Sequence, residues 1–236
     1  MNTKRGLNNI LYGILSQVIT MGISIIVPRL VLINLGSETN GLLHSISTVF
    51  TYLSLLEAGV GKATNQALYK PLASDDKNEI NRIMAATNKF YRRTGYIYAA
   101  AVLVFAAVYC LFVKTSLPAT LVFSVIVLSG ASSVLSYFVQ GKYRVLMGAE
   151  GKGYILTNIS TAATILTSVC KILLLVWGFG VVPIQGMYLF FSFLQMLLVV
   201  RYIRRDYKWL DLKVEPDYDA ISQRNYVLLH QITGMI

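Results

Sequence analysis

The chain has 236 residues, of which 55% are hydrophobic and only 14% are charged. Soluble domains carry roughly 25% charged residues, and here the charges are missing from long blocks and concentrated between them. This pattern excludes an ordinary soluble domain and predicts an integral membrane protein. The net charge of +10 does not indicate a nucleic-acid-binding protein, because the Lys and Arg residues form short clusters beside apolar segments, where they orient helices and contact lipid headgroups.

Six apolar segments are each long enough to cross roughly 30 Å of hydrocarbon as a helix. We therefore predict an all-α integral membrane protein built as a six-transmembrane-helix bundle. Lys4 and Arg5 precede the first segment, but no small-residue cleavage site ends it, so a retained helix is expected rather than a signal peptide. The predicted spans are residues 9–33, 41–63, 94–113, 118–140, 154–177 and 182–200.

The basic residues predict the orientation of this bundle. With the N-terminus in the cytoplasm, 18 of the 21 Lys and Arg residues fall in cytoplasmic segments: Lys4 and Arg5, seven from 62 to 93, three from 142 to 152 and six from 201 to 224. The outer side receives only Arg29 and Lys114, and Lys171 falls within the fifth span. Because basic residues are enriched in cytoplasmic loops, this asymmetry predicts a cytoplasmic N-terminus.

Three parts are expected along the chain: a six-helix lobe at 1–206, a cytoplasmic linker at 207–225, and a truncated start of a seventh span at 226–236. The last part is apolar but too short to cross a bilayer. We therefore expect that the native chain continues past Ile236, or that two copies associate. The longest loop is expected at 64–93, where Pro71 breaks the structure and Ser74 caps a helix that runs into the third span.

Polar residues recur at helical spacing along five of the six predicted spans. A membrane helix that lines a wet cavity carries such a stripe, but small polar residues also let membrane helices pack closely. Packing is the better interpretation for a single Ser or Thr, whereas five stripes together favour a polar interior, and both stay open. The mostly apolar span 94–113 is expected at the periphery. The stripes are Ser16, Gln17, Thr20 and Ser24; His44, Ser47, Thr51 and Ser54; Ser129, Ser133, Ser136, Gln140 and Arg144; Thr157, Thr161, Thr164 and Ser168; and Gln185, Tyr188, Ser192 and Gln195.

Ionisable residues inside the spans are stronger indicators, because a charge in hydrocarbon costs at least about 2.5 kcal/mol. Lys171 lies deep in the fifth span, on its polar stripe. It is too far from the outer end to snorkel comfortably, so we interpret it as a cavity-facing cation, with a snorkelling or paired lysine as the alternative. Arg29 follows Pro28, where a kink is expected, and is either an outer-interface anchor or a cavity residue.

Two further ionisable residues have competing interpretations. Glu57 is the only acidic residue in the six predicted spans. It is either half of an ion pair with Lys62 or Arg29, or the ligand of a coupling ion. His44 lies near the outer end of the second span, where a solvated interface histidine is favoured over a proton carrier.

A cavity lined by Lys and Arg suits an anionic substrate, because Arg binds phosphate oxygens through a fork of donors and Lys binds them as a point charge. We therefore predict that Arg29 and Lys171 bind the phosphates of a lipid-linked substrate.

An enzyme is not expected, because no nucleotide-binding loop, metal cluster or nucleophile–base motif is present, and no cofactor is expected. The glycines from Gly148 to Gly153 are interpreted as a turn. The full candidate substrate-binding set is Arg29, Lys171, Lys62, Gln17, His44, Gln140 and Arg144.

Several motifs along the chain resemble those of the polysaccharide flippases, a branch of the superfamily that also holds the multidrug and toxic-compound extrusion (MATE) antiporters. A Leu-Gly turn at Leu35-Gly36, a following glycine at Gly41, and a Leu-Leu-Glu-Ala-Gly-Val-Gly run at 55–61 match the first two helices of that family. The segment YRVLMGAEGKGY at 143–154 resembles the loop between its fourth and fifth spans. The resemblance covers essentially the whole chain.

This resemblance implies the N-terminal lobe of a MATE-like fold, in which two six-helix lobes enclose a central cleft that works by alternating access. It implies transport of an undecaprenyl-pyrophosphate-linked oligosaccharide across the bacterial cytoplasmic membrane, for O-antigen (lipopolysaccharide), capsule, exopolysaccharide or teichoic acid assembly. Arg29 is the residue carried over from the family. The expected partners are membrane lipid and either a missing C-terminal lobe or a second copy. The alternatives are a Na⁺- or H⁺-coupled drug or cation antiporter that uses Glu57, and a non-transporting fragment.

Overall fold

The computed structural model describes residues 3–222, except for the side chains of residues 55–58. This part is 87% helical and contains no strand. The predicted start of a seventh span at 226–236 lies outside the described residues, as does the end of the predicted linker. The elements are α1 (Thr3–Ala73), α2 (Lys77–Phe112), α3 (Ala119–Leu135), a π-helix η1 (Ser136–Gln140), α4 (Gly141–Ala149), α5 (Gly153–Val176), α6 (Val181–Asp206) and a 3₁₀ turn η2 (Asp219–Ile221).

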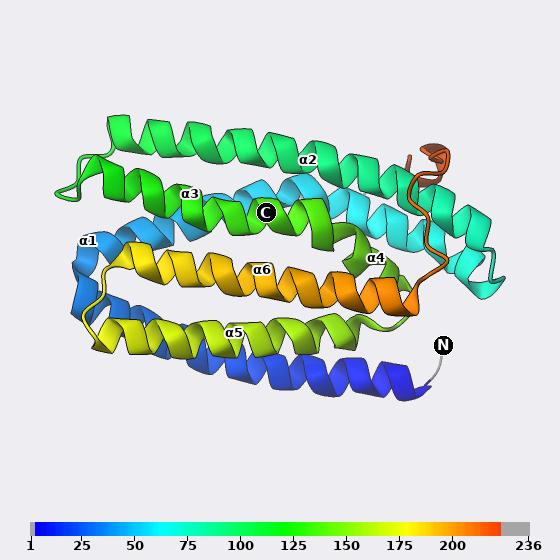
Figure 1. Ribbon diagram of the computed structural model, residues 1–236, viewed down its shortest axis with the longest axis horizontal. Helices are drawn as coiled ribbons and strands as arrows, with labels where there is room; N and C mark the ends of the chain where they lie inside the picture. Colours follow the sequence, from blue (N-terminus) through cyan, green and yellow to red (C-terminus); the bar gives the residue numbers. More distant parts are fainter. Residues whose placement is uncertain (1–2, 223–236) are drawn as a thin grey trace, which may run out of the picture.

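Helix α1 reverses direction at Gly36. Figure 1 shows its first arm (residues 3–35, blue) and its second arm (residues 37–73, light blue to cyan) running in opposite directions. Gly36 has φ 82° and ψ 171°, outside the helical region. Only glycine occupies this region without strain, since it has no Cβ. The turn therefore falls on the Leu35-Gly36 pair noted in the sequence.

The first prediction concerns this turn. Replacing Gly36 with alanine should lower the free energy of unfolding by about 1–3 kcal/mol, the range for a residue held in a strained backbone conformation. Thermal unfolding in detergent measures the change. Gly22→Ala is the matched control, because Gly22 lies within the first arm with nothing within 4 Å of an added Cβ, and alanine favours a helix. Equal stability of the two variants would contradict the assignment of the turn.

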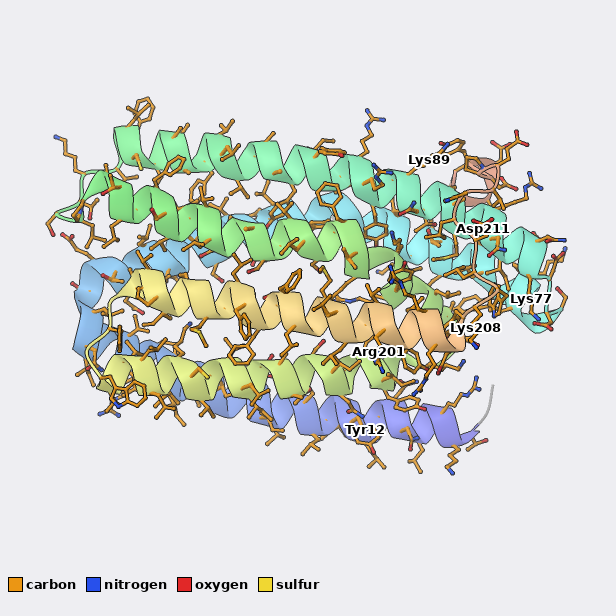
Figure 2. All side chains as sticks on the ribbon, in the orientation of Figure 1. Tyr12, Lys77, Lys89, Arg201, Lys208 and Asp211 are labelled. Atoms are coloured by element: carbon orange, nitrogen blue, oxygen red, sulfur yellow. The ribbon has the colours of Figure 1, made fainter. Side chains whose placement is uncertain are left out.

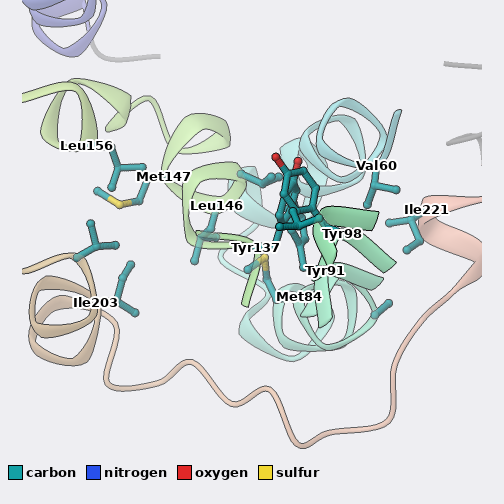
Figure 3. Close-up of a cluster of buried hydrophobic side chains, with 14 of the residues drawn as sticks. Val60, Met84, Tyr91, Tyr98, Tyr137, Leu146, Met147, Leu156, Ile203 and Ile221 are labelled. Carbon is teal, nitrogen blue, oxygen red and sulfur yellow. The ribbon is translucent and has the colours of Figure 1, made fainter. Parts of the chain in front are cut away.

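The helices pack side by side in the order seen in Figure 1. The first arm of α1 lies against α5, and α5 lies against α6, followed by α3 and α2. The second arm of α1 packs against α2 and α4. The main buried cluster lies on this side of the bundle and includes Tyr91, Tyr98, Tyr137 and Leu146 (Figure 3). Helix α2, expected at the periphery, therefore lies at the edge of the bundle but supplies much of the core.

The outer surface of the bundle is apolar. Large hydrophobic side chains are exposed along the helices, with Leu111 of α2 80% exposed. A water-soluble protein does not expose so much apolar surface, whereas lipid accommodates it. The described residues thus form an all-helical bundle with the apolar surface expected of a membrane protein. Within residues 3–222, the helices long and apolar enough to cross a membrane are Thr3–Ser54, Lys77–Phe112, Ala119–Ala149, Gly153–Val176 and Val181–Asp206.

These five helices do not settle the number of crossings. The first, Thr3–Ser54, contains the turn at Gly36 and so includes the first arm of α1 and part of the second. Whether the two arms cross the bilayer separately, which would make six spans, stays a prediction.

Most basic side chains gather at one end of the bundle, which we call the basic end. The start of α1, the α1–α2 turn, the α4–α5 turn and the end of α6 all lie there (Figure 1). Figure 2 places Lys77, Lys89, Arg201 and Lys208 at this end. The fold therefore brings together the basic clusters that the sequence predicted to share one side of the membrane.

The α1–α2 connection is shorter than predicted. Helix α1 continues to Ala73 and α2 runs from Lys77 to Phe112, so the expected helix that runs into the third span is confirmed, whereas the expected break at Pro71 is wrong because Pro71 lies within α1. Asp76 rather than Ser74 caps α2, because its carboxylate accepts from the backbone N–H groups of Asn78 (3.1 Å) and Glu79 (3.0 Å). The second arm of α1 is thus helical almost to the α1–α2 turn.

A cluster of polar side chains connects the α4–α5 turn to the end of α6. Lys152 Nζ lies 2.9 Å from Glu150 Oε1 and 4.9 Å from the centre of the Tyr207 ring, and the Tyr207 hydroxyl donates to Glu150. Burial, together with this hydrogen bond, raises the pKa of Tyr207, so the hydroxyl stays protonated and remains a donor. Gly151 has φ 73° in this turn, which confirms that the glycine-rich segment is a turn.

The N-terminal end of α1 joins the same turn. Asn9 Nδ2 donates to the Gly151 carbonyl (2.9 Å), and Asn9 Oδ1 accepts from the Tyr154 backbone N–H (2.6 Å). Residues 207–222 then cross to α2, where Asn81 bonds the backbone of Trp209 and Asp211. The described part of the predicted linker is therefore packed on the bundle, with Ile221 fully buried.

Candidate functional site

A cavity of about 580 Å³ lies among the second arm of α1 and helices α2, α3, α5 and α6. Along α1 its lining runs from Leu43 to Ser54, about 16 Å of helix. Residues from the polar stripes of four predicted spans meet here. The lining residues are Leu43, Ile46, Ser47, Phe50, Thr51, Ser54, Tyr98, Ser129, Ser133, Ser136, Tyr137, Arg144, Lys171, Gln185 and Tyr188.

Two cations line this cavity, Lys171 and Arg144. Arg144 is on α4, close to the basic end, whereas Lys171 is in the half of α5 farther from that end (Figure 1). None of the described lining residues is acidic, and no described carboxylate lies within 4.0 Å of either cation. The cavity therefore has a net positive charge spread along the bundle axis, which attracts anions.

Three hydroxyl groups in the cavity donate to carbonyl groups of their own helices. Thr51 Oγ1 donates to the Ser47 carbonyl (2.8 Å), Ser54 Oγ to the Thr51 carbonyl (2.6 Å) and Ser129 Oγ to the Val125 carbonyl (2.7 Å). This back-bonding is common for Ser and Thr in helices. It leaves the oxygen lone pairs available to accept hydrogen bonds, so the hydroxyls suit a ligand rich in O–H donors, while the two cations suit anionic oxygens.

Aromatic side chains form one wall of the cavity. The rings of Tyr98 and Tyr137 lie 4.9 Å apart, and Phe50 lies 5.8 Å from Tyr98. Tyr137 belongs to the π-helix η1, a wider i→i+5 turn that occurs frequently at functional sites. Sequence reasoning missed Tyr98 and Tyr137, because both lie in apolar surroundings off the Ser/Thr stripes. A tyrosine within an apolar span was the available signal.

Other polar stripes pack helices together instead. Thr161 Oγ1 of α5 donates to Ser16 Oγ of α1 at 2.8 Å. Thr64 and Thr87 share a buried hydrogen bond of 3.0 Å between α1 and α2. Both interpretations left open by the sequence therefore apply, each to different residues: these hydroxyls join helices, while those of residues 47–54 and 129–136 line the cavity.

Gln140 takes part in such packing rather than lining the cavity. It is 7% exposed, and its Oε1 accepts from Gln195 Nε2 at 3.3 Å. Gln195 Nε2 also lies 3.0 Å from Ser160 Oγ. Gln140 thus links η1 to α6 and, through Gln195, to α5.

The remaining candidate residues lie away from the cavity. Gln17, Arg29, His44 and Lys62 are exposed side chains of α1 and are not among its lining residues. The structure therefore brings together two of the seven predicted substrate-binding residues, Lys171 and Arg144, and leaves the roles of the others as predictions. Glu57 belongs to α1, but its side chain lies outside the described residues.

Comparisons of the chain with models of protein families, with curated proteins and with solved structures return no match. Among the described side chains, no group of three His, Cys, Asp or Glu residues could hold a metal ion. The functional argument therefore depends on the chemistry of the cavity.

Proposed function

We propose that this protein transports an anionic lipid-linked oligosaccharide, of the polyprenyl-pyrophosphate type, through the cavity that contains Lys171 and Arg144. The observation that carries the proposal is this pair of cations in a cavity of about 580 Å³ with no acidic residue in its described lining. A pyrophosphate is a small group with several anionic oxygens, which Arg and Lys bind strongly. Ligand cavities of small molecules are of similar volume.

The rest of the lining supports the same substrate class. Sugar hydroxyls are donors, and the back-bonded hydroxyl oxygens of Thr51, Ser54 and Ser129 are acceptors. Tyr98, Tyr137 and Tyr188 add rings with polar tips, which contact both apolar and polar parts of a ligand. The cavity thus combines sites for an anionic group with sites for a carbohydrate.

The proposed arrangement in the membrane has six spans with the basic end in the bacterial cytoplasm, as the charge asymmetry favours. In this proposal the chain forms the N-terminal lobe of a MATE-like transporter, and a second six-helix unit completes the cleft. Repeated halves that rock around a site near the membrane centre are common in transporters. Arg144 and Lys171 lie at different depths in the bundle. In this proposal, the pyrophosphate group of the substrate can therefore contact a cation whether the cleft is open to one side of the membrane or to the other.

Equilibrium binding tests this proposal without requiring transport by the chain alone. The purified protein in detergent is titrated with a fluorescent polyprenyl pyrophosphate carrying a short oligosaccharide, and with the corresponding polyprenol. We expect the pyrophosphate lipid to bind at least about tenfold more tightly, because a charge-assisted hydrogen bond contributes about 1.5–3 kcal/mol. Inorganic pyrophosphate should compete. Equal affinity for the two lipids would overturn the proposal.

A matched variant separates this function from a cation antiporter. Glu57→Gln removes the only carboxylate in the predicted spans and should leave pyrophosphate-lipid binding unchanged. Loss of Na⁺- or H⁺-driven export of a small cation in this variant, together with no binding of the pyrophosphate lipid by the wild type, would favour the antiporter.

A further inference from the structure

A second hollow lies outside the cation-lined cavity, on the surface between α5 and α6 near the basic end. It has a volume of about 790 Å³ and is lined by Ile159 of α5 and by residues of α6 that include Leu197, Arg201 and Arg204. Residues three and four apart on a helix share one face, so the two arginines and Leu197 point to the same side of α6. Figure 2 shows Arg201 beside α5 at this end of the bundle.

An apolar hollow of about 300 Å³ continues from this basic hollow along the same two helices. The two share Ile159 and Leu198, and the apolar one extends to Leu166 on α5 and Phe191 on α6. Together they form one groove, the α5–α6 groove. From Arg201 to Phe191 the groove follows about 15 Å of helix, which equals the hydrocarbon thickness of one leaflet, about half of the 30 Å core.

The mouth of the α5–α6 groove has an excess of positive charge. Arg205 is paired with Asp206 at 2.7 Å. Among the described side chains, no carboxylate lies within 4.0 Å of Arg201 or Arg204, so these two charges are not neutralised by the fold. Guanidinium groups bind phosphate oxygens through paired donors, and basic pockets between membrane helices bind anionic lipid headgroups.

We propose that the α5–α6 groove binds one anionic phospholipid, with its phosphate on Arg201 and Arg204 and one acyl chain along Ala162, Leu166 and Leu194. A free phosphate would bind only at Arg201 and Arg204, in the basic part of the groove. A phospholipid fills both the basic and the apolar part of a groove that is one leaflet long. A zwitterionic lipid would bring its own positive headgroup charge close to the two arginines, whereas an anionic lipid brings only negative charge. The inference depends on membrane insertion but not on the proposed transport function.

Native mass spectrometry of the purified full chain tests the proposal. The protein is incubated with an equimolar mixture of phosphatidylglycerol and phosphatidylcholine that have identical acyl chains. The wild type should retain one phosphatidylglycerol in preference to phosphatidylcholine. The double variant Arg201→Gln/Arg204→Gln should lose about tenfold or more in phosphatidylglycerol affinity, since each charged hydrogen bond contributes about one decade.

Matched variants separate the groove from general effects of charge and bulk. Lys77→Gln/Lys208→Gln removes the same charge at the same end but outside the groove (Figure 2), and should retain the lipid. Ala162→Trp fills the apolar part of the groove and should weaken retention, whereas Ala100→Trp, on an exposed part of α2, should not. Lys171→Met should leave retention unchanged, which distinguishes this site from the transport cavity.

Three outcomes would overturn the proposal. Equal retention of the two lipids by the wild type would mean ordinary annular lipid. Unchanged phosphatidylglycerol affinity in Arg201→Gln/Arg204→Gln would remove the arginines from the site. A dimeric mass without bound lipid, lost in Ala162→Trp, would mean that a second copy of the chain occupies the groove.

Discussion

Replacing Lys171 with methionine should lower the affinity for a pyrophosphate lipid by about tenfold or more, because a hydrogen bond to a charged group contributes about 1.5–3 kcal/mol. Lys171 lines the cavity, and methionine keeps a similar unbranched shape without the charge. Titration of the fluorescent pyrophosphate lipid measures the change. The affinity for the uncharged polyprenol should stay the same.

Stability separates this effect from misfolding. A cation within a membrane helix bundle is costly unless it is paired, and no described carboxylate lies within 4.0 Å of Lys171. Lys171→Met should therefore have a Tm equal to or higher than that of the wild type while it binds the ligand less well. Lys171→Arg should retain most of the binding. A variant that lost binding and stability together would indicate a structural role for Lys171.

Two further variants compare the cations along the chain. Arg144→Gln should weaken binding of the pyrophosphate lipid, because Arg144 lines the same cavity. Arg29→Gln should have a smaller effect, because Arg29 is exposed and does not line it. The sequence hypothesis paired Arg29 with Lys171, so the reverse order of effects would favour that hypothesis over the arrangement of the cavity.

Replacing Gly141 with alanine should lower the free energy of unfolding by about 3 kcal/mol, at the upper end of the usual range for overpacking. An added Cβ would overlap the ring of Tyr91. That ring is 1% exposed and belongs to the main buried cluster, so it has no free space to move into. Thermal unfolding of the purified protein in detergent measures the loss.

Thermal unfolding in detergent also measures the control variant and the compensating variant. Gly13→Ala adds a Cβ with nothing within 4 Å, and should be neutral or slightly stabilising because alanine favours the helix. Tyr91→Leu should reduce the cost of Gly141→Ala, which a double-mutant cycle would report as a coupling energy. Additive effects of the two substitutions would show that Tyr91 does not limit the space at Gly141. Because Gly141 begins the helix that carries Arg144, Gly141→Ala should also weaken ligand binding.

The membrane character and the helical class followed from the sequence, because both depend on quantities that the local sequence contains. Long apolar blocks must be helical in lipid, where every backbone group needs a partner within the segment. The positions of the turns were also accessible: the Leu35-Gly36 pair coincides with the reversal of α1, and Gly151 lies in the α4–α5 turn. The cap of α2 was misplaced by two residues, since Ser74 and Asp76 are both good capping residues.

Only some of the residues that line the cavity could be predicted from the sequence. Sequence analysis predicted Lys171 and Arg29 as the phosphate-binding pair and kept Arg144 only in the wider candidate set, because a polar or charged residue on a predicted span has the same local pattern whichever neighbour its helix faces. The π-helix at Ser136–Gln140 adds a second reason. Its i→i+5 turn departs from the 3.6-residue spacing, so Gln140 turns toward Gln195 while Ser136 and Arg144 reach the cavity.

The sequence by itself determined that this chain is a helical membrane protein, roughly where its helices begin and end, and which loops carry its positive charge. Only the tertiary structure decided which polar faces meet. Thr161 bonds Ser16 across a helix contact, while Ser133 and Thr51 face a shared cavity. The physical reason is that small polar residues satisfy either close packing or a wet cavity equally well, so the neighbouring helix determines the role of each.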